Sequence, residues 1–262
     1  MRISVSLVVT LVLIETIGFI PPVCAGLIAS WSGDGNANDS IASRNGTLAN
    51  GAGFGSGRFG QSFRLDGVND YVSVPDDNVW TFGSNPFTVA LWANFDVIKQ
   101  QSLGLLPNVF IAHDQGGGTQ NKWVFFYDDD GNLAFHINGT GSVFLTSPTT
   151  FFPTVGNWHH FALTRIGSTY TFYADGGSLG TRTASQLIPN ANAALTIGQA
   201  EGLGFFDGDL DEVQIYDEAL SAEQISQLSV IPEPSAWILL VVGTLGVLGF
   251  DFLHRKKSGV KA

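Results

Sequence analysis

The side chains best suited to metal binding are gathered in residues 32–40, which read SGDGNANDS. Aspartate and asparagine oxygens separated by glycine can surround a hard cation such as calcium. The segment is not an EF-hand loop, because Asn45 stands where such a loop has its bidentate glutamate. The same residue types also form Asx turns that satisfy local backbone groups, so a solvated loop is the alternative interpretation.

Three aspartates alternate near the end of the chain, at Asp207, Asp209 and Asp211. Alternate residues of a strand point to one face, and paired carboxylates are the acid–base groups of glycoside hydrolysis. The adjacent His159 and His160 would point to opposite faces of a strand, so they do not form a joint metal site. No phosphate-binding glycine loop occurs. Glycoside cleavage is therefore kept as one candidate activity.

The composition predicts an all-β protein without a nucleic-acid partner. The 262 residues include 32 Gly and 20 Phe but one Met, and 13% are charged. This composition argues against a helical protein and against disorder. A net charge of −11 opposes binding to a phosphate backbone. The single Cys excludes a disulfide scaffold and a cysteine-based zinc site.

Short apolar segments between Gly, Asn and Asp turns predict one sandwich domain over residues 26–230. Residues 87–93 alternate large and small side chains, and residues 123–127 and 133–137 flank an Asp-Gly turn. Ser221–Ile225 has the pattern of a capping box that opens a short helix. Seven basic and twenty acidic residues give this domain a charge of −13, which favours cations over anionic partners.

Residues 1–25 have the pattern of a secretory signal peptide. A basic start and an apolar stretch over residues 3–20 precede Val23-Cys24-Ala25, a small-residue cleavage site. Cleavage after Ala25 would leave a mature chain without cysteine. A retained membrane anchor is the alternative, but the Pro21-Pro22 pair argues against it.

The C-terminal segment, residues 231–262, combines three signals in order. They are the motif Pro232-Glu233-Pro234-Ser235, an apolar stretch over residues 236–253, and a basic tip over residues 254–257 that includes Arg255, Lys256 and Lys257. The apolar stretch spans about 27 Å as a helix, enough to cross a bilayer, and the basic tip favours a cytoplasmic C-terminus. The arrangement resembles the PEP-CTERM sorting signal of bacterial secreted proteins. That resemblance implies recognition by an exosortase, removal of the segment, and release or attachment outside a cell that makes exopolysaccharide. A plain transmembrane anchor is the alternative.

Five segments, in order along the chain, resemble the motifs of LamG-like jelly-roll domains. They are Phe63–Val72, Phe87–Trp92, Asn157–Leu163, Tyr173–Gly176 and Phe206–Tyr216. The resemblance implies a concanavalin A-like sandwich of two antiparallel sheets packed face to face. The signal helix and the transmembrane helix would flank this sandwich in the unprocessed chain.

The family resemblance also carries expectations about the site. LamG-like and pentraxin-like domains often hold a calcium ion between an early loop and the last strand. Carried over, this nominates Asp34, Asn38 and Asp39 with Asp211 as calcium ligands. Endoglucanases of the same fold use an E-x-D-x-x-E strand, which does not occur in this sequence. We therefore expect no catalytic site, because the fold alone does not supply one.

The aromatic residues have two expected roles. The predicted core anchors are Trp92, Trp123 and Trp158. Trp80, Phe82 and Phe205 adjoin glycine-rich turns and are the candidates for stacking on sugar rings.

Together these patterns predict an exported cell-surface or matrix protein that binds an extracellular polysaccharide or a surface protein, with calcium as a structural cofactor. Before processing, it would be held in the membrane by its C-terminal helix. The alternatives are a structural spacer without a specific ligand and a glycan-cleaving hydrolase.

Overall fold

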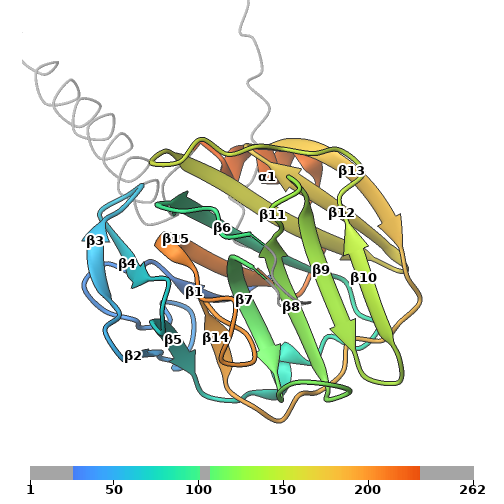
Figure 1. Cartoon of the computed structure of the whole chain (residues 1–262). Helices are drawn as coiled ribbons and strands as arrows, with labels where there is room; N and C mark the ends of the chain where they lie inside the picture. The colour runs from blue at the N-terminus through green and yellow to red at the C-terminus, as the bar shows by residue number, and fades with distance from the viewer. Residues whose placement is uncertain (1–25, 101–106, 231–262) are drawn as a thin grey trace, which may run out of the picture.

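The computed structural model describes residues 26–100 and 107–230, which form two antiparallel β-sheets packed face to face (Figure 1). This part of the chain contains fifteen strands, the 3-10 helix η1 (Asn78–Trp80) and the α-helix α1 (Ala222–Leu228). The predicted all-β sandwich is therefore confirmed.

The predicted signal peptide, residues 1–25, and the predicted sorting segment, residues 231–262, lie outside the described residues. Within the described ranges, no helix has the length and apolar character needed to cross a membrane.

Sheet A contains eight strands. Seven of them lie in the order β13-β12-β11-β6-β15-β4-β3, and β1 pairs with the second half of β15. The strands are β1 (Leu27–Trp31), β3 (Gly53–Ser56), β4 (Gln61–Asp66), β6 (Phe87–Phe95), β11 (Trp158–Ile166), β12 (Thr169–Ala174), β13 (Gly177–Thr183) and β15 (Asp207–Tyr216). The early and late parts of the chain thus meet in the middle of this sheet.

Sheet B contains seven strands in the order β10-β9-β8-β7-β14-β5-β2. They are β2 (Thr47–Ala49), β5 (Tyr71–Val74), β7 (Val109–Asp114), β8 (Lys122–Tyr127), β9 (Leu133–Asn138), β10 (Ser142–Thr146) and β14 (Leu195–Ile197). The edge strands β10 of sheet B and β13 of sheet A contact each other along one side of the sandwich, at the right of Figure 1.

Local sequence explains these strands and turns. Alternate residues of β6 from Phe87 to Phe95 are fully buried against the opposite sheet. Strands β8 and β9 form the predicted hairpin, in which Gly131 has a φ of 90° that other residues rarely adopt. The Asp128 carboxylate closes this turn by accepting hydrogen bonds from the backbone N–H groups of Asp130 and Asn132.

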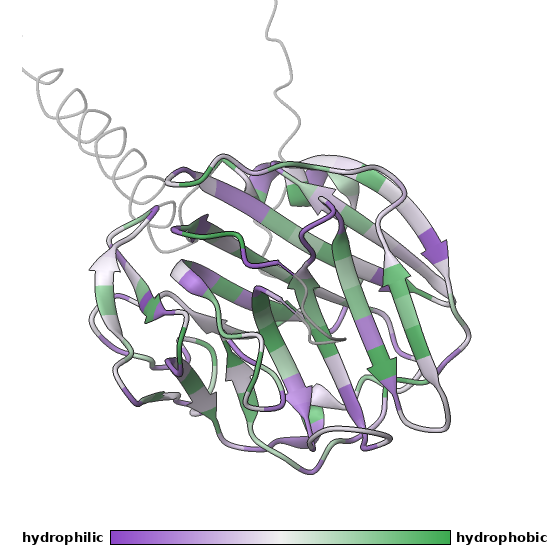
Figure 2. Ribbon diagram, in the orientation of Figure 1, coloured by the Kyte–Doolittle hydropathy of each residue, from purple (hydrophilic) through white to green (hydrophobic). Residues whose placement is uncertain are grey.

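The core between the sheets is built from aromatic rings. Phe95 of sheet A contacts Phe110 of sheet B at a ring-centroid distance of 6.0 Å. Figure 2 shows hydrophobic residues running along β8 and β9, which face this core. Trp123 is fully buried in the core, as predicted. The prediction for Trp92 was wrong, because Trp92 lies between inward-facing Leu91 and Ala93 and therefore points to the outer face of sheet A.

Helix α1 covers part of the outer face of sheet A. Ser221 caps it with the predicted capping box, in which the Ser221 side chain and Gln224 satisfy each other's backbone N–H groups. Ile225 is fully buried in a cluster with Ala90 and Ala162, whose small side chains let the helix approach the sheet. The helix therefore closes the part of this face around Ala90 and Ala162.

Candidate functional site

The outer face of sheet B exposes a large aromatic ring at its edge. The side chain of Phe144 on β10 is 53% exposed and lies flat on His136 of β9, with ring centroids 3.9 Å apart and planes 12° apart. Phe126 of β8 meets Phe144 edge-on at 6.4 Å. We call Phe126, His136 and Phe144 the aromatic platform. Its outward ring is flat and open to solvent, which is the shape needed to stack on a sugar ring.

Strand register explains why the platform forms. Phe144 pairs directly with His136, so the two side chains lie on the same face of the sheet. Ser142 and Thr146 lie on this face too, two residues to either side of Phe144. The platform is therefore bordered by hydroxyl groups that can hydrogen-bond to a ligand.

His136 supports the platform as a neutral ring. Its Nε2 lies 3.0 Å from the Ser142 hydroxyl oxygen. Burial is the main cause that lowers the pKa of His136 to about 4, and the nearby charge of Lys122 contributes to this shift. The imidazole is thus uncharged near neutral pH, and Phe144 stacks on an uncharged surface.

Among the described residues, the cation close to the platform is Lys122, and its charge is balanced by neighbouring carboxylates of the same domain. Lys122 is 1% exposed, donates a hydrogen bond to Glu201, and has its Nζ 3.8 Å from Asp114. Burial raises the pKa of Asp114, because it disfavours the charged form of this carboxyl group. Lys122 is a buried structural cation and does not reach a ligand at the surface.

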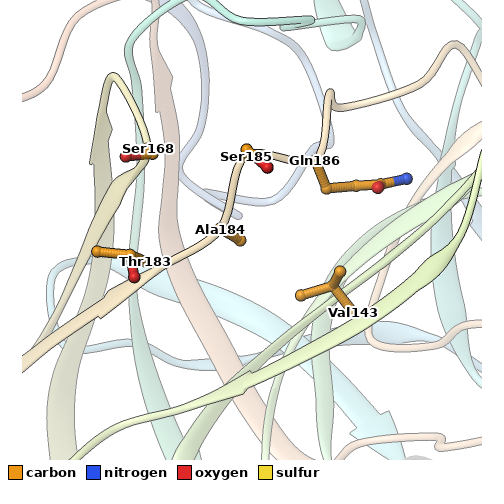
Figure 3. A pocket seen from close by; sticks show the side chains of 6 residues that line it. All are labelled: Val143, Ser168, Thr183, Ala184, Ser185 and Gln186. Atoms are coloured by element: carbon orange, nitrogen blue, oxygen red, sulfur yellow. The ribbon is translucent and has the colours of Figure 1, made fainter.

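A polar groove lies beside the platform, where the edges of the two sheets meet. It has a volume of about 490 Å³ and is lined by Val143, Ser168, Thr183, Ala184, Ser185 and Gln186 (Figure 3). Val143 precedes Phe144 on β10, so the groove and the platform occupy the two sides of one edge strand. Three of the lining side chains carry hydroxyl groups, as sugar-binding sites commonly do.

Backbone and amide contacts fix the far wall of the groove. The Ala184 N–H donates to the Ser168 carbonyl at 2.9 Å. The Gln186 amide donates to the Gly141 carbonyl at 3.1 Å and to the Thr140 hydroxyl at 3.2 Å. These bonds join the segment after β13 to the β9–β10 turn, so the groove is held by residues far apart in the sequence.

The structure separates the predicted calcium ligands into two places. Asp34 accepts from the Gln61 N–H at 2.7 Å, and Asp211 accepts from the Phe59 N–H at 3.1 Å, so both hold the turn before β4. Burial raises the pKa of Asp211 to about 7, and the negative charge of Asp34 adds to this effect. These two carboxylates are the pair that the structure brings together.

Asp39 and Asn38 lie elsewhere. One Asp39 oxygen accepts from the backbone N–H groups of Ser30 and Ile41, and the other lies 3.8 Å from Arg44. Asn38 is exposed, and its backbone N–H donates to the side-chain oxygen of Asn36 at 2.9 Å. Among the described residues, no three His, Cys, Asp or Glu side chains form a group that could hold a metal ion.

The alternating aspartates of β15 are held separately. Asp209 and Asp211 share the outer face of sheet A, as the strand pattern predicts. However, Asp209 forms an ion pair with Arg64 at 2.8 Å and accepts from the Ser62 hydroxyl at 3.1 Å. After Asp211 the strand bulges, and Glu212 takes a φ of 49°. Both carboxylates therefore serve the local structure.

His159 and His160 point to opposite faces, as predicted. His160 pairs with Trp92 on the outer face and is buried, whereas His159 bonds to Asp175 through Nδ1 at 2.8 Å. The two rings share no ligand site.

Two of the predicted sugar-stacking residues are in the core. Trp80 is fully buried and Phe82 is 4% exposed, with Phe82 stacked on Phe87 at 4.4 Å. This prediction was wrong for both residues, because a neighbouring glycine turn does not determine which way a ring points. Phe205 is half-buried, and its backbone carbonyl accepts from Lys99. A stacking role for Phe205 stays a prediction.

Sequence reasoning missed the aromatic platform. The segment Ser142–Thr146 reads SVFLT, and its three consecutive apolar residues hide the alternation. Which of these side chains faces the core becomes clear only from the pairing with β9. This pairing places Leu145 opposite Phe135 in the core, so Phe144 points to the outer face. The alternation of inward and outward residues in the β8–β9 hairpin, continued into the next strand, would have predicted that Phe144 faces outward.

Comparison with protein families places the chain in a known group. Residues 66–226 match the family model Laminin_G_3, described as the concanavalin A-like lectin/glucanases superfamily, and the chain belongs to this family. The comparison with curated proteins gave no match.

Solved structures share the fold at low sequence identity. One of them is domain 4 of AbnA, a GH43 extracellular arabinanase from Geobacillus stearothermophilus, in complex with arabinotriose. Its sequence is 20% identical to this chain, with a TM-score of 0.64, and the match covers 78% of this chain and 98% of that one. The binding domain of Paraclostridial Mosquitocidal Protein 1 is 19% identical with a TM-score of 0.62, over 78% and 52%. The binding domain of Botulinum Neurotoxin DC in complex with SialylT is 13% identical with a TM-score of 0.58, over 78% and 51%. This chain spans about half of the two toxin chains.

Proposed function

We propose that this protein is an exported carbohydrate-binding protein whose ligand lies along the β10 edge. The observation that carries the proposal is the open ring of Phe144, which lies flat on a neutral His136 and is bordered by hydroxyl groups. Sugars present apolar C–H faces that pack on such rings, while their hydroxyl groups bond to polar neighbours. The family contains lectins, and two structural neighbours were solved in complex with arabinotriose and with SialylT, which supports this class of ligand.

Two alternatives are weaker. A glycan-cleaving hydrolase would need two carboxylates facing a substrate, but Asp209 and Asp211 are engaged by Arg64 and by backbone N–H groups. A spacer without a ligand is weaker because it does not account for the stacked pair of Phe144 and His136 with hydroxyl groups on both sides. A surface protein as the ligand would use the same exposed edge, and the experiment below distinguishes it from a polysaccharide.

Affinity electrophoresis and calorimetry of the purified chain against plant and bacterial polysaccharides test the proposal. Phe144→Ala is expected to weaken binding roughly tenfold, since a buried aromatic contact accounts for much of such an interface. Phe152→Ala is the matched control, because Phe152 is 70% exposed and lies against Gly131 at the β8–β9 turn, and among the described residues it is not one of the rings in contact with Phe126, His136 or Phe144. Equal loss in both variants, or no polysaccharide bound by the wild type, would reject the proposal.

We also propose the route by which the protein reaches its ligand. The signal peptide would direct export, and an exosortase would recognise Pro232–Ser235, remove the C-terminal helix and release or attach the protein outside the cell. Mass spectrometry of the extracellular protein tests this: the expected species begins after Ala25 and lacks the basic tip. An intact chain in the cytoplasm would contradict it.

Calcium binding remains a proposal, supported by Asp34 and Asp211. Burial and the neighbouring charge of Asp34 raise the pKa of Asp211, and a cation held between the two carboxylates would offset both effects. We expect calcium to raise the melting temperature of metal-stripped protein, and Asp211→Asn to abolish that rise. An unchanged melting temperature would reject the site without affecting the sugar-binding proposal.

A further inference from the structure

The charge of the domain is distributed very unevenly. Residues 131–200 contain two basic residues and one acidic residue, a net charge of +1. The rest of the domain, residues 26–130 and 201–230, contains five basic and nineteen acidic residues, a net charge of −14. The single carboxylate of the first segment is Asp175, which lies past the end of β12 and bonds to His159. The β10–β13 side of the sandwich is therefore poor in carboxylates within an acidic domain.

The seven basic side chains of the domain differ in their partners. Arg44, Arg64 and Lys122 form ion pairs with carboxylates, Lys99 donates to backbone carbonyls, and Arg58 lies over aromatic rings. The remaining two, Arg165 and Arg182, have no carboxylate within 4 Å in the described part of the chain. Both belong to the strands that lead into the polar groove.

Strand register places these two arginines in one row. Arg165 of β11 pairs with Tyr170 of β12, and Tyr170 pairs with Arg182 of β13. Directly paired residues have side chains on the same face, so the three lie side by side on the inner face at the open edge of the sandwich. Arg182 is exposed and directly precedes Thr183 of the groove.

The buried part of the row has spare hydrogen-bonding capacity. Arg165 is 2% exposed and donates to the carbonyls of Gly83 at 2.6 Å and of Gln186, a groove residue, at 3.5 Å. Its guanidinium lies 5.4 Å from the Tyr170 ring centroid. The Arg165 Nε and the Tyr170 hydroxyl are buried without a hydrogen-bond partner in the described residues. Such groups are rare in native proteins and call for a partner.

We infer that the groove between β10 and β13 takes the carboxylate of an acidic sugar. Arg182 pairs with this carboxylate at the mouth of the groove, while Arg165 adds positive potential from below and the hydroxyl groups of Ser168 and Ser185 bond to the sugar ring. The overall negative charge of the domain repels anionic polymers at long range, so this recognition is local and depends on salt. The inference rests on the proposed function and names its substrate class.

Matched pairs of polymers test the charge dependence. The purified full chain is titrated with polygalacturonate and with the same polymer after carboxyl reduction, which replaces each carboxylate by a hydroxymethyl group. A second pair, polysialic acid and its carboxyl-reduced form, distinguishes uronate from sialate as the source of the carboxylate. We expect roughly tenfold tighter binding to one carboxylated polymer than to its reduced partner at low salt, and a smaller ratio at high salt.

Variants localise the effect. Arg182→Gln is expected to lower that ratio to near one while leaving the affinity for the reduced polymer unchanged. Arg58→Gln is the matched control, because Arg58 is also exposed and unpaired with carboxylates but lies on the outer face of sheet A. Phe144→Ala should weaken binding to both polymers of a pair and keep their ratio.

The outcomes separate the two proposals. Equal binding to carboxylated and reduced polymers, or a ratio that Arg182→Gln does not change, overturns the acidic-sugar inference and leaves the platform proposal standing. Binding that Arg182→Gln alters but Phe144→Ala does not supports the groove and overturns the platform. No binding to any polymer overturns both.

Discussion

Each outer face of the sandwich carries an aromatic ring beside a buried histidine, edge-on at 64° on sheet A and stacked at 12° on sheet B, and the two rings differ in exposure. On sheet A, Trp92 meets buried His160 at a centroid distance of 5.4 Å; on sheet B, Phe144 meets buried His136 at 3.9 Å. Burial lowers the pKa of both histidines to about 4. Yet Trp92 is 5% exposed and Phe144 is 53% exposed.

The difference lies in what covers each ring. The Arg58 guanidinium lies 4.7 Å from the Trp92 ring centroid, and Phe59 packs edge-on against Trp92 at 6.0 Å. Helix α1 covers another part of the same face, around Ala90 and Ala162. Phe144 has no comparable cover among the described residues. A ring beside a neutral histidine is thus a structural element on sheet A and an open contact surface on sheet B.

The largest expected effect tests this difference through stability. Trp92→Ala should destabilise the protein by about 3–5 kcal/mol, because it leaves a cavity under Arg58 and Phe59. Phe144→Ala should cost less than about 1 kcal/mol, since half of the ring already faces water. Urea unfolding of both variants measures the two values. Similar losses would show that both rings are structural.

The second prediction concerns pH and treats the two faces alike. Because folding depresses the pKa of His136 and His160, the unfolded chain takes up protons first as the pH falls below about 6.5. Stability should therefore fall between about pH 6.5 and pH 4, by roughly 1.4 kcal/mol per pH unit for each histidine. Denaturant unfolding across this range, compared between wild type, His136→Gln and His160→Gln, measures the slope.

Each variant should remove about the same share of that slope. Burial is the main cause of both shifts, although the charged neighbours differ: Lys122 and Glu201 act on His136, and Asp175 acts on His160. A slope that neither variant changes would mean that both histidines are protonated in the folded protein.

Much of the fold, but little of the site, could be predicted from the sequence. The β8–β9 hairpin and the α1 cap depend on neighbouring residues, such as the Asp-Gly turn and the Ser221–Gln224 pair, and both were predicted correctly. Which way a ring faces depends on strand register, and this is why Trp92 and Phe144 were not placed. The polar groove joins β10 to residues 183–186, which no local pattern connects.

The third prediction removes cover from sheet A alone. Ser221→Ala deletes the N-cap of α1 and should cost about 1 kcal/mol. Amide exchange in Ala222–Leu228 should accelerate, while exchange in β9 and β10 and the affinity for polysaccharide stay unchanged. Loss of ligand affinity in this variant would show that the two faces are coupled through the core.

The smallest effect concerns the lid over Trp92. Arg58 is exposed, and its guanidinium carbon lies 4.7 Å from the Trp92 ring centroid and 5.2 Å from the Phe59 ring centroid. Arg58→Gln should cost only about 0.5–1 kcal/mol, the usual range for an exposed cation–π contact. A double-mutant cycle with Trp92→Phe measures the coupling, which should account for most of that cost. Absence of coupling would mean that Arg58 covers Trp92 without stabilising it, and the closed state of sheet A would then depend on helix α1 and Phe59.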